Sequence, residues 1–136
     1  MSRRALALTL GLALALPGCG LEVQLQDLFL LTRTGQGTTL RLVVNDSGTI
    51  RCNGGPTRTL SSAQLIQARV LADGLATDAT KHLTIARAPD TVFYYRIKLQ
   101  QGTVAFPDHA AGTHETLAQA ELFAAQAAQK PCHLAG

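Results

Sequence analysis

VFYYRIKLQQGTVAF, residues 92–106, is the stretch that decides the fold class, because it predicts a β-hairpin. Residues alternate along its first half. One face of the predicted strand carries Phe93, Tyr95, Ile97 and Leu99, and the other carries Val92, Tyr94, Arg96 and Lys98. Gln100-Gln101-Gly102 supplies the turn, and the return strand 103–106 ends at Pro107. The hairpin therefore predicts an antiparallel sheet with one apolar face.

The region 25–52 predicts a meander of three further strands. These cover residues 25–33, 38–44 and 49–52, each rich in apolar or β-branched side chains. Thr34-Gly35-Gln36-Gly37 and Asn45-Asp46-Ser47-Gly48 contain the residues that favour tight turns. Because the turns are short, we expect neighbouring strands to pair antiparallel.

Two helices are predicted from their start signals and apolar spacing. The first follows the N-cap pair Ser61-Ser62 and is expected to end near Ala72, where Asp73-Gly74 can stop it. Residues 76–90 are interpreted as a loop. The second is expected over residues 114–129, and its apolar stripe consists of Leu117, Ala120, Phe123, Ala124 and Ala127.

The order strand-strand-strand-helix-strand-strand-helix predicts an α+β fold: an antiparallel sheet of about five strands with two helices on one face. If the helices cover the Phe93 and Tyr95 face, the opposite face presents Tyr94, Arg96 and Lys98 to solvent, with Arg41 beside them. Residues 25–136 are expected to form a single globular domain.

The first residues have the order of a secretory signal, with Arg3-Arg4 ahead of the apolar run Ala5 to Leu16. Leu16-Pro17-Gly18-Cys19 resembles the lipobox of bacterial lipoproteins. That resemblance implies that residues 1–18 are a signal peptide, that Cys19 carries lipid, and that residues 19–24 form a lipidated tether. It further implies a place on the extracytoplasmic face of a bacterial cell membrane. The twin arginine leaves both the Sec and the twin-arginine export routes open.

With Cys19 assigned to lipid, two of the three cysteines are left. Two thiols of a small domain in an oxidising compartment usually form a disulfide, so Cys52 and Cys132 are expected to pair. The alternative, in which Cys132 is a catalytic nucleophile, needs a histidine positioned by the fold. The adjacent His133 is poorly placed for that role.

Composition and motifs argue against several functions. Without Arg3 and Arg4, the 12 basic residues become ten against nine acidic ones, with no basic cluster interleaved with aromatics, so no nucleic acid is expected. No catalytic motif, phosphate loop or metal-binding spacing is present, so we expect no enzyme, cofactor or metal. His109 and His114, flanked by Asp108 and Glu115, could gather as metal ligands only if their loop folded back.

Two features remain as candidates for binding. The first is the row Tyr94, Arg96 and Lys98, an aromatic residue with basic neighbours on an open strand face. The second is the loop Asn53-Gly54-Gly55, which follows Cys52 and would be ordered in advance by a disulfide. A solvated strand and an ordinary connection explain the same residues.

The layout from residue 25 to 128 resembles that of the emfourin family, small bacterial inhibitors of thermolysin-like metalloproteases. The resemblance lies in Leu31-Thr32-Arg33-Thr34-Gly35 and in Phe93-Tyr94-Tyr95-Arg96-Ile97 facing residues 103–108. It assigns no inhibitory residue. The sequence thus predicts a lipid-anchored, non-catalytic domain that binds a protein or a small partner, with a protease as one candidate. The alternatives are a structural envelope lipoprotein without a ligand and a cryptic hydrolase.

Overall fold

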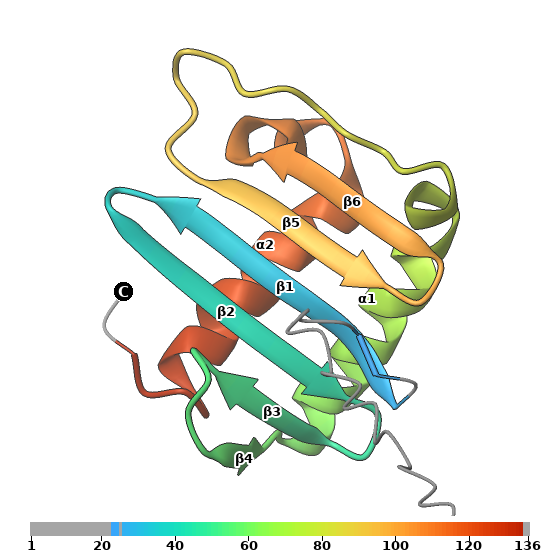
Figure 1. Cartoon of the computed structure of the whole chain (residues 1–136), viewed down its shortest axis with the longest axis vertical. Coiled ribbons are helices and arrows are strands. Elements are labelled where there is room, and N and C mark those ends of the chain that lie inside the picture. The colour runs from blue at the N-terminus through green and yellow to red at the C-terminus, as the bar shows by residue number, and fades with distance from the viewer. Residues whose placement is uncertain (1–22, 25, 135–136) are drawn as a thin grey trace, which may run out of the picture.

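The computed structural model describes residues 23–24 and 26–134, and its centre is an antiparallel sheet of six strands (Figure 1). The spatial order of the strands is β4-β3-β2-β1-β5-β6. Their bounds are Asp27–Gly35 for β1, Thr38–Asn45 for β2, Thr49–Cys52 for β3, Thr57–Thr59 for β4, Tyr94–Leu99 for β5 and Gly102–Pro107 for β6. The central strand β1 pairs with β2 on one side and β5 on the other, which joins the meander to the hairpin.

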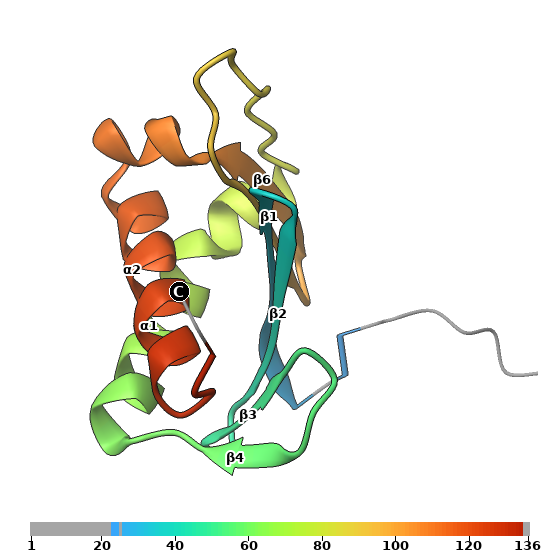
Figure 2. The same ribbon diagram turned by 90° about the vertical axis from the view of Figure 1, so that its left-hand side faces the viewer.

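Two helices lie on the same face of this sheet (Figure 2). They are α1, Ser62–Thr80, and α2, Glu115–Gln129, and the short 3-10 helix η1, Asp108–Gly112, precedes α2. No helix of the described residues lies on the other face, which we call the open face. The predicted α+β class and the placement of both helices are confirmed.

The core fills the space between the sheet and the helices. Phe29 of β1 meets Phe123 of α2 edge to face, with ring centroids 5.6 Å apart. Tyr95 and Phe106 stack across β5 and β6 at 5.1 Å. The alternation seen in the sequence holds, because Tyr95, Ile97 and Leu99 are buried while Arg96 is exposed. Such aromatic pairs add to the stabilisation from burial alone.

The helix α1 is longer than predicted. Its start is as expected: Ser61 is the N-cap and forms a reciprocal capping box with Gln64. Its end was predicted wrongly, because Asp73-Gly74 does not stop it and residues 76–80 are helical rather than loop. Leu75 and Ala79 continue the buried stripe, and their burial outweighs the cost of about 1 kcal/mol for a glycine inside a helix.

The strands differ from the prediction at two places. The sheet has six strands rather than the expected five, because β4 pairs with β3. β5 starts at Tyr94 instead of Val92 because the amides of Val92 and Phe93 donate to the Asp108 carboxylate, at 3.3 and 3.1 Å, rather than to a strand. The hairpin between β1 and β2 is tight, with positive φ at both Gln36 and Gly37, as a type I′ turn requires.

All strands and helices of the described residues lie between Asp27 and Gln129, and the core includes both Cys52 and Cys132. The chain from Gly20 onward therefore retains every residue of the described core, and we expect it to fold as one domain. The predicted signal peptide, residues 1–18, and the proposed lipidation residue Cys19 lie outside the described residues. Of the predicted tether 19–24, only residues 23 and 24 are described.

Candidate functional site

A groove runs between α1 and α2 on the side of the helices that faces away from the sheet. Its floor contains Leu71 of α1 and Phe123 of α2, both buried in the core. Three large apolar side chains stand exposed around it: Ile66 at 60%, Val70 at 56% and Leu122 at 55%. The remaining lining residues are Gln67, Gln119 and Gln126. The helices therefore present a continuous apolar strip with amides at its borders.

The size and lining of this groove limit what it can bind. Its volume is about 230 Å³, below the roughly 300–1,000 Å³ of typical small-molecule sites. None of the residues that line it is charged. It has the shape and chemistry to receive one or two apolar side chains of another polypeptide. Exposed apolar patches bordered by polar residues are typical of such interfaces.

This groove was not predicted from the sequence, although a signal for it is present there. Ile66 and Val70 are four residues apart on α1 and lie off the apolar stripe formed by Leu65, Ala68, Ala72 and Leu75. A second apolar stripe on an amphipathic helix indicates a second contact surface. That Leu122 completes the patch depends on how α2 packs beside α1, which the sequence does not reveal.

The predicted row on β5 is on the open face, but its three residues differ in access. Arg96 is exposed and Lys98 is half-exposed. Tyr94 is half-buried, because its hydroxyl donates to the carbonyl of Ile85 at 3.0 Å and the Arg87 guanidinium lies 4.3 Å from its ring centroid. The expectation that Tyr94 stands free in solvent is therefore wrong. The loop after α1 folds over that end of the sheet.

The loop Asn53-Gly54-Gly55 borders the same open face. Asn53 has a positive φ of 49° and forms two hydrogen bonds with the Arg41 backbone, at 2.7 and 2.8 Å. The amide of Gly55 donates to the Cys52 carbonyl at 2.9 Å. A shallow hollow of about 480 Å³ is lined by Thr39, Arg41, Val43, Arg51, Asn53 and Gly54. Arg41 was expected to lie directly beside Arg96. Thr32 of β1 separates the two residues, so that expectation is wrong.

The two cysteines of the predicted disulfide lie at disulfide distance, with Cα atoms 5.8 Å apart. Cys52 ends β3, and Cys132 follows the end of α2. The pair therefore ties the last helix to the meander and fixes the base of the Asn53 loop. Both residues are buried in the core. The start of the Asn53 loop is thus held by the cysteine pair and by the two hydrogen bonds between Asn53 and Arg41.

Among the described carboxyl groups, Glu121 of α2 has the clearest change in pKa. Burial, followed by the nearby charge of Asp108, raises its pKa to about 7. Its Oε1 is enclosed and accepts no hydrogen bond from the described residues. A perturbed carboxyl can mark a catalytic site. Glu121 does not line the groove between the helices, so this groove places no substrate beside it.

The described residues contain neither a metal centre nor a membrane-spanning helix. No three His, Cys, Asp or Glu side chains gather there as they would to hold a metal ion. His109 and His114 do not come together with Asp108 and Glu115 as a ligand set; His114 instead occupies the N-cap of α2. None of the described helices combines the length and apolarity needed to cross a bilayer. Comparison with known protein families, curated proteins and solved structures gave no match.

Proposed function

We propose that this chain is a lipid-anchored, extracytoplasmic binding domain without catalytic activity, whose partner is a protein. The observation that carries the proposal is the uncharged groove between α1 and α2, where Ile66, Val70 and Leu122 are more than half exposed. Covering these three side chains with apolar groups of a partner would remove their apolar surface from water, which favours the complex.

The rigidity of the groove also supports binding. Its two walls belong to helices packed on one sheet, and the end of α2 is held to β3 by the pair of Cys52 and Cys132. A surface that is ordered before the partner arrives loses little conformational entropy on binding. Amide borders at Gln67, Gln119 and Gln126 can donate and accept hydrogen bonds with a polypeptide backbone. These features suit a peptide segment or loop with one or two apolar anchors.

Lipid anchoring is the second part of the proposal, and it depends on the lipobox resemblance at Cys19. Mass spectrometry of the full chain expressed in bacteria tests it. We expect a mature protein that begins at Cys19 and carries acyl chains, and we expect Cys19→Ser to abolish that product. An intact amino terminus, or a mature protein without acyl mass, would contradict the anchor.

The emfourin resemblance makes secreted thermolysin-like metalloproteases the first partners to test. Residues 20–136 should slow such a protease at micromolar excess. Val70→Asp places a charge in the groove and should weaken inhibition about tenfold or more. Val92→Asp is the matched control, because Val92 is also an exposed valine, at 45%, and lies outside the groove.

The outcomes of the protease assay test both the partner class and the contact surface. If wild-type protein slows none of these proteases, they are not the partner class. If inhibition occurs but Val70→Asp and Val92→Asp retain it equally, the groove is not the contact surface. Near-UV circular dichroism of each variant confirms that the fold is unchanged.

A further inference from the structure

The open face of the sheet concentrates positive charge. Four cationic side chains project from its strands: Arg41 of β2, Arg51 of β3, and Arg96 and Lys98 of β5. Strand registers place Arg96 and Arg41 on either side of Thr32, and Lys98 and Arg51 in the next row, on either side of Leu30 and Val43. We call these four residues the basic face.

Acidic side chains lie mostly elsewhere in the described part of the chain. Asp73 and Asp78 are on α1, Glu115 and Glu121 on α2, Asp108 on η1 and Asp46 in the turn after β2. Asp27 begins β1, where its carboxylate accepts a hydrogen bond from the Asn45 side chain at 3.2 Å, and Asp90 is in the loop before β5. The two layers of the domain therefore differ in charge: the helical layer is acidic and the open face basic.

Arg41 gives local evidence that this face can accept an anion. Its side chain is half-buried, and its Nε is enclosed without an acceptor among the described residues. An enclosed donor without an acceptor is costly, and an anionic oxygen would remove that cost. Arg41 also borders the hollow shared with Arg51 and the Asn53 loop, so there is room for such a group.

The spread of the basic face favours an extended anionic surface over one small anion. It runs from β3 to β5 across three strand spacings, about 14 Å. A single phosphate cannot reach side chains that far apart, whereas a plane of headgroups can meet all of them. The face is also accessible away from the loop that covers Tyr94, because no helix of the described residues lies on it (Figure 2).

The start of the chain indicates which anionic surface this is. The first described residues, drawn blue, lie on the side of the sheet away from the helices (Figure 2). They are held there: the Gln100 side chain donates to the Gln24 carbonyl at 2.5 Å, and the Asp46 amide to the Gln26 carbonyl at 2.9 Å. Cys19 is five residues before Gln24, at most about 18 Å away. A lipid on Cys19 would bring the open face to the bilayer.

We propose that the basic face rests on anionic phospholipid headgroups, so that the groove between α1 and α2 points away from the membrane toward its partner. This inference rests on the proposed lipid anchor at Cys19. Lysines and arginines near an anionic bilayer are each attracted to it independently of any specific pocket. One short lipidated tether plus a basic surface would hold the domain in a single orientation.

Vesicle flotation of residues 20–136, which lack Cys19, tests the basic face separately from the anchor. We expect binding to phosphatidylcholine vesicles that contain phosphatidylglycerol, no binding to pure phosphatidylcholine, and release at high salt. The triple variant Arg41→Gln, Arg51→Gln, Arg96→Gln should bind about 100-fold more weakly. The charge-matched control is Arg58→Gln, Lys81→Gln, Lys130→Gln, which should bind like wild type.

The remaining outcomes would overturn the proposal. Equal losses in the two triple variants would show that only net charge matters. Binding to immobilised polyglutamate but not to the anionic vesicles would identify an acidic polypeptide as the occupant. Binding to neither probe would leave the face without an anionic partner. Because acylation is measured on the full chain by mass spectrometry, a failed anchor and a failed basic face give different results.

Discussion

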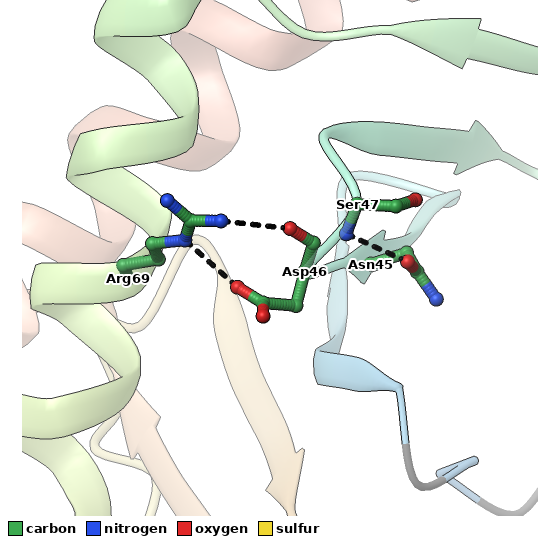
Figure 3. A network of polar contacts seen from close by, with 4 residues as sticks. All are labelled: Asn45, Asp46, Ser47 and Arg69. Atoms are coloured by element: carbon green, nitrogen blue, oxygen red, sulfur yellow. Dashed lines mark hydrogen bonds and ion pairs between the residues drawn. The ribbon is translucent and has the colours of Figure 1, made fainter.

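Arg69 of α1 holds the turn between β2 and β3 through two hydrogen bonds to one residue, Asp46 (Figure 3). Its Nε donates to the Asp46 carboxylate at 2.7 Å, and its Nη2 donates to the Asp46 carbonyl at 3.0 Å. The Ser47 amide donates to the Asn45 side chain at 2.9 Å and closes the same turn. The contact joins the helical layer to the end of the sheet where β1 begins.

Arg69→Ala should lower the free energy of unfolding by about 1 kcal/mol or less. Both side chains are about half exposed, at 49% and 58%, and ion pairs at the surface contribute little. Urea denaturation of Arg69→Ala, Asp46→Ala and the double variant measures the coupling. The hydrogen bond from Arg69 to the backbone carbonyl of residue 46 survives in Asp46→Ala. That variant should therefore lose less stability than Arg69→Ala. Equal losses would contradict a role for the carbonyl.

Removing the covalent link between Cys52 and Cys132 should be far more damaging. The two residues are separated by 80 positions, and closing a loop of that length stabilises a protein by about 4 kcal/mol in the chain-entropy model. Cys52→Ser, Cys132→Ser should therefore lose a large share of the stability of a small domain. Thermal unfolding with and without reductant measures it. An unchanged midpoint, with both thiols shown to be free, would contradict the prediction.

Glu121 should make the domain less stable as pH rises. Its pKa is about 7 in the fold against 4.5 in the unfolded chain. The stability associated with its protonated form is therefore complete below pH 4.5 and lost as pH rises through about 7. Because the side chain is only partly buried, we expect a loss of about 1–2 kcal/mol. Glu121→Gln should remove this loss, which urea midpoints at pH 4 and pH 8 would show. An equal pH dependence in the variant would contradict it.

Local patterns predicted most of the fold because they arise from neighbours in the sequence. The alternation of Tyr95, Ile97 and Leu99 and the turns of the meander needed no knowledge of the rest of the chain. β4 was missed because residues 57–59 carry no apolar alternation and become a strand only by pairing with β3. Sequence therefore finds elements that bury a face and misses those that only complete a sheet.

The candidate sites were harder to predict because they depend on contacts between distant segments. Tyr94 follows the alternation of its strand, yet Ile85 and Arg87 cover it. These two residues belong to a loop whose path could not be predicted from the sequence. Ile66 and Val70 are visible as a second stripe, but the groove exists only because α2 brings Leu122 beside them. The sequence thus identifies residue types that could bind a partner, but it does not predict which of them are accessible to solvent.

Gly74, where the sequence predicted the end of α1, should tolerate a methyl group but nothing larger. A Cβ built there lies 3.1 Å from Cγ2 of Thr116 in α2, so the helices approach closely at this point. Gly74→Ala gains about 0.5–1 kcal/mol of helix propensity, which offsets a shift of a few tenths of an ångström by Thr116. Gly74→Leu has no such space and should lose roughly 1–3 kcal/mol by pushing α1 from α2. Thermal unfolding of the two variants measures this. A neutral Gly74→Leu would mean that the helices separate freely, and the groove between them would then not be rigid.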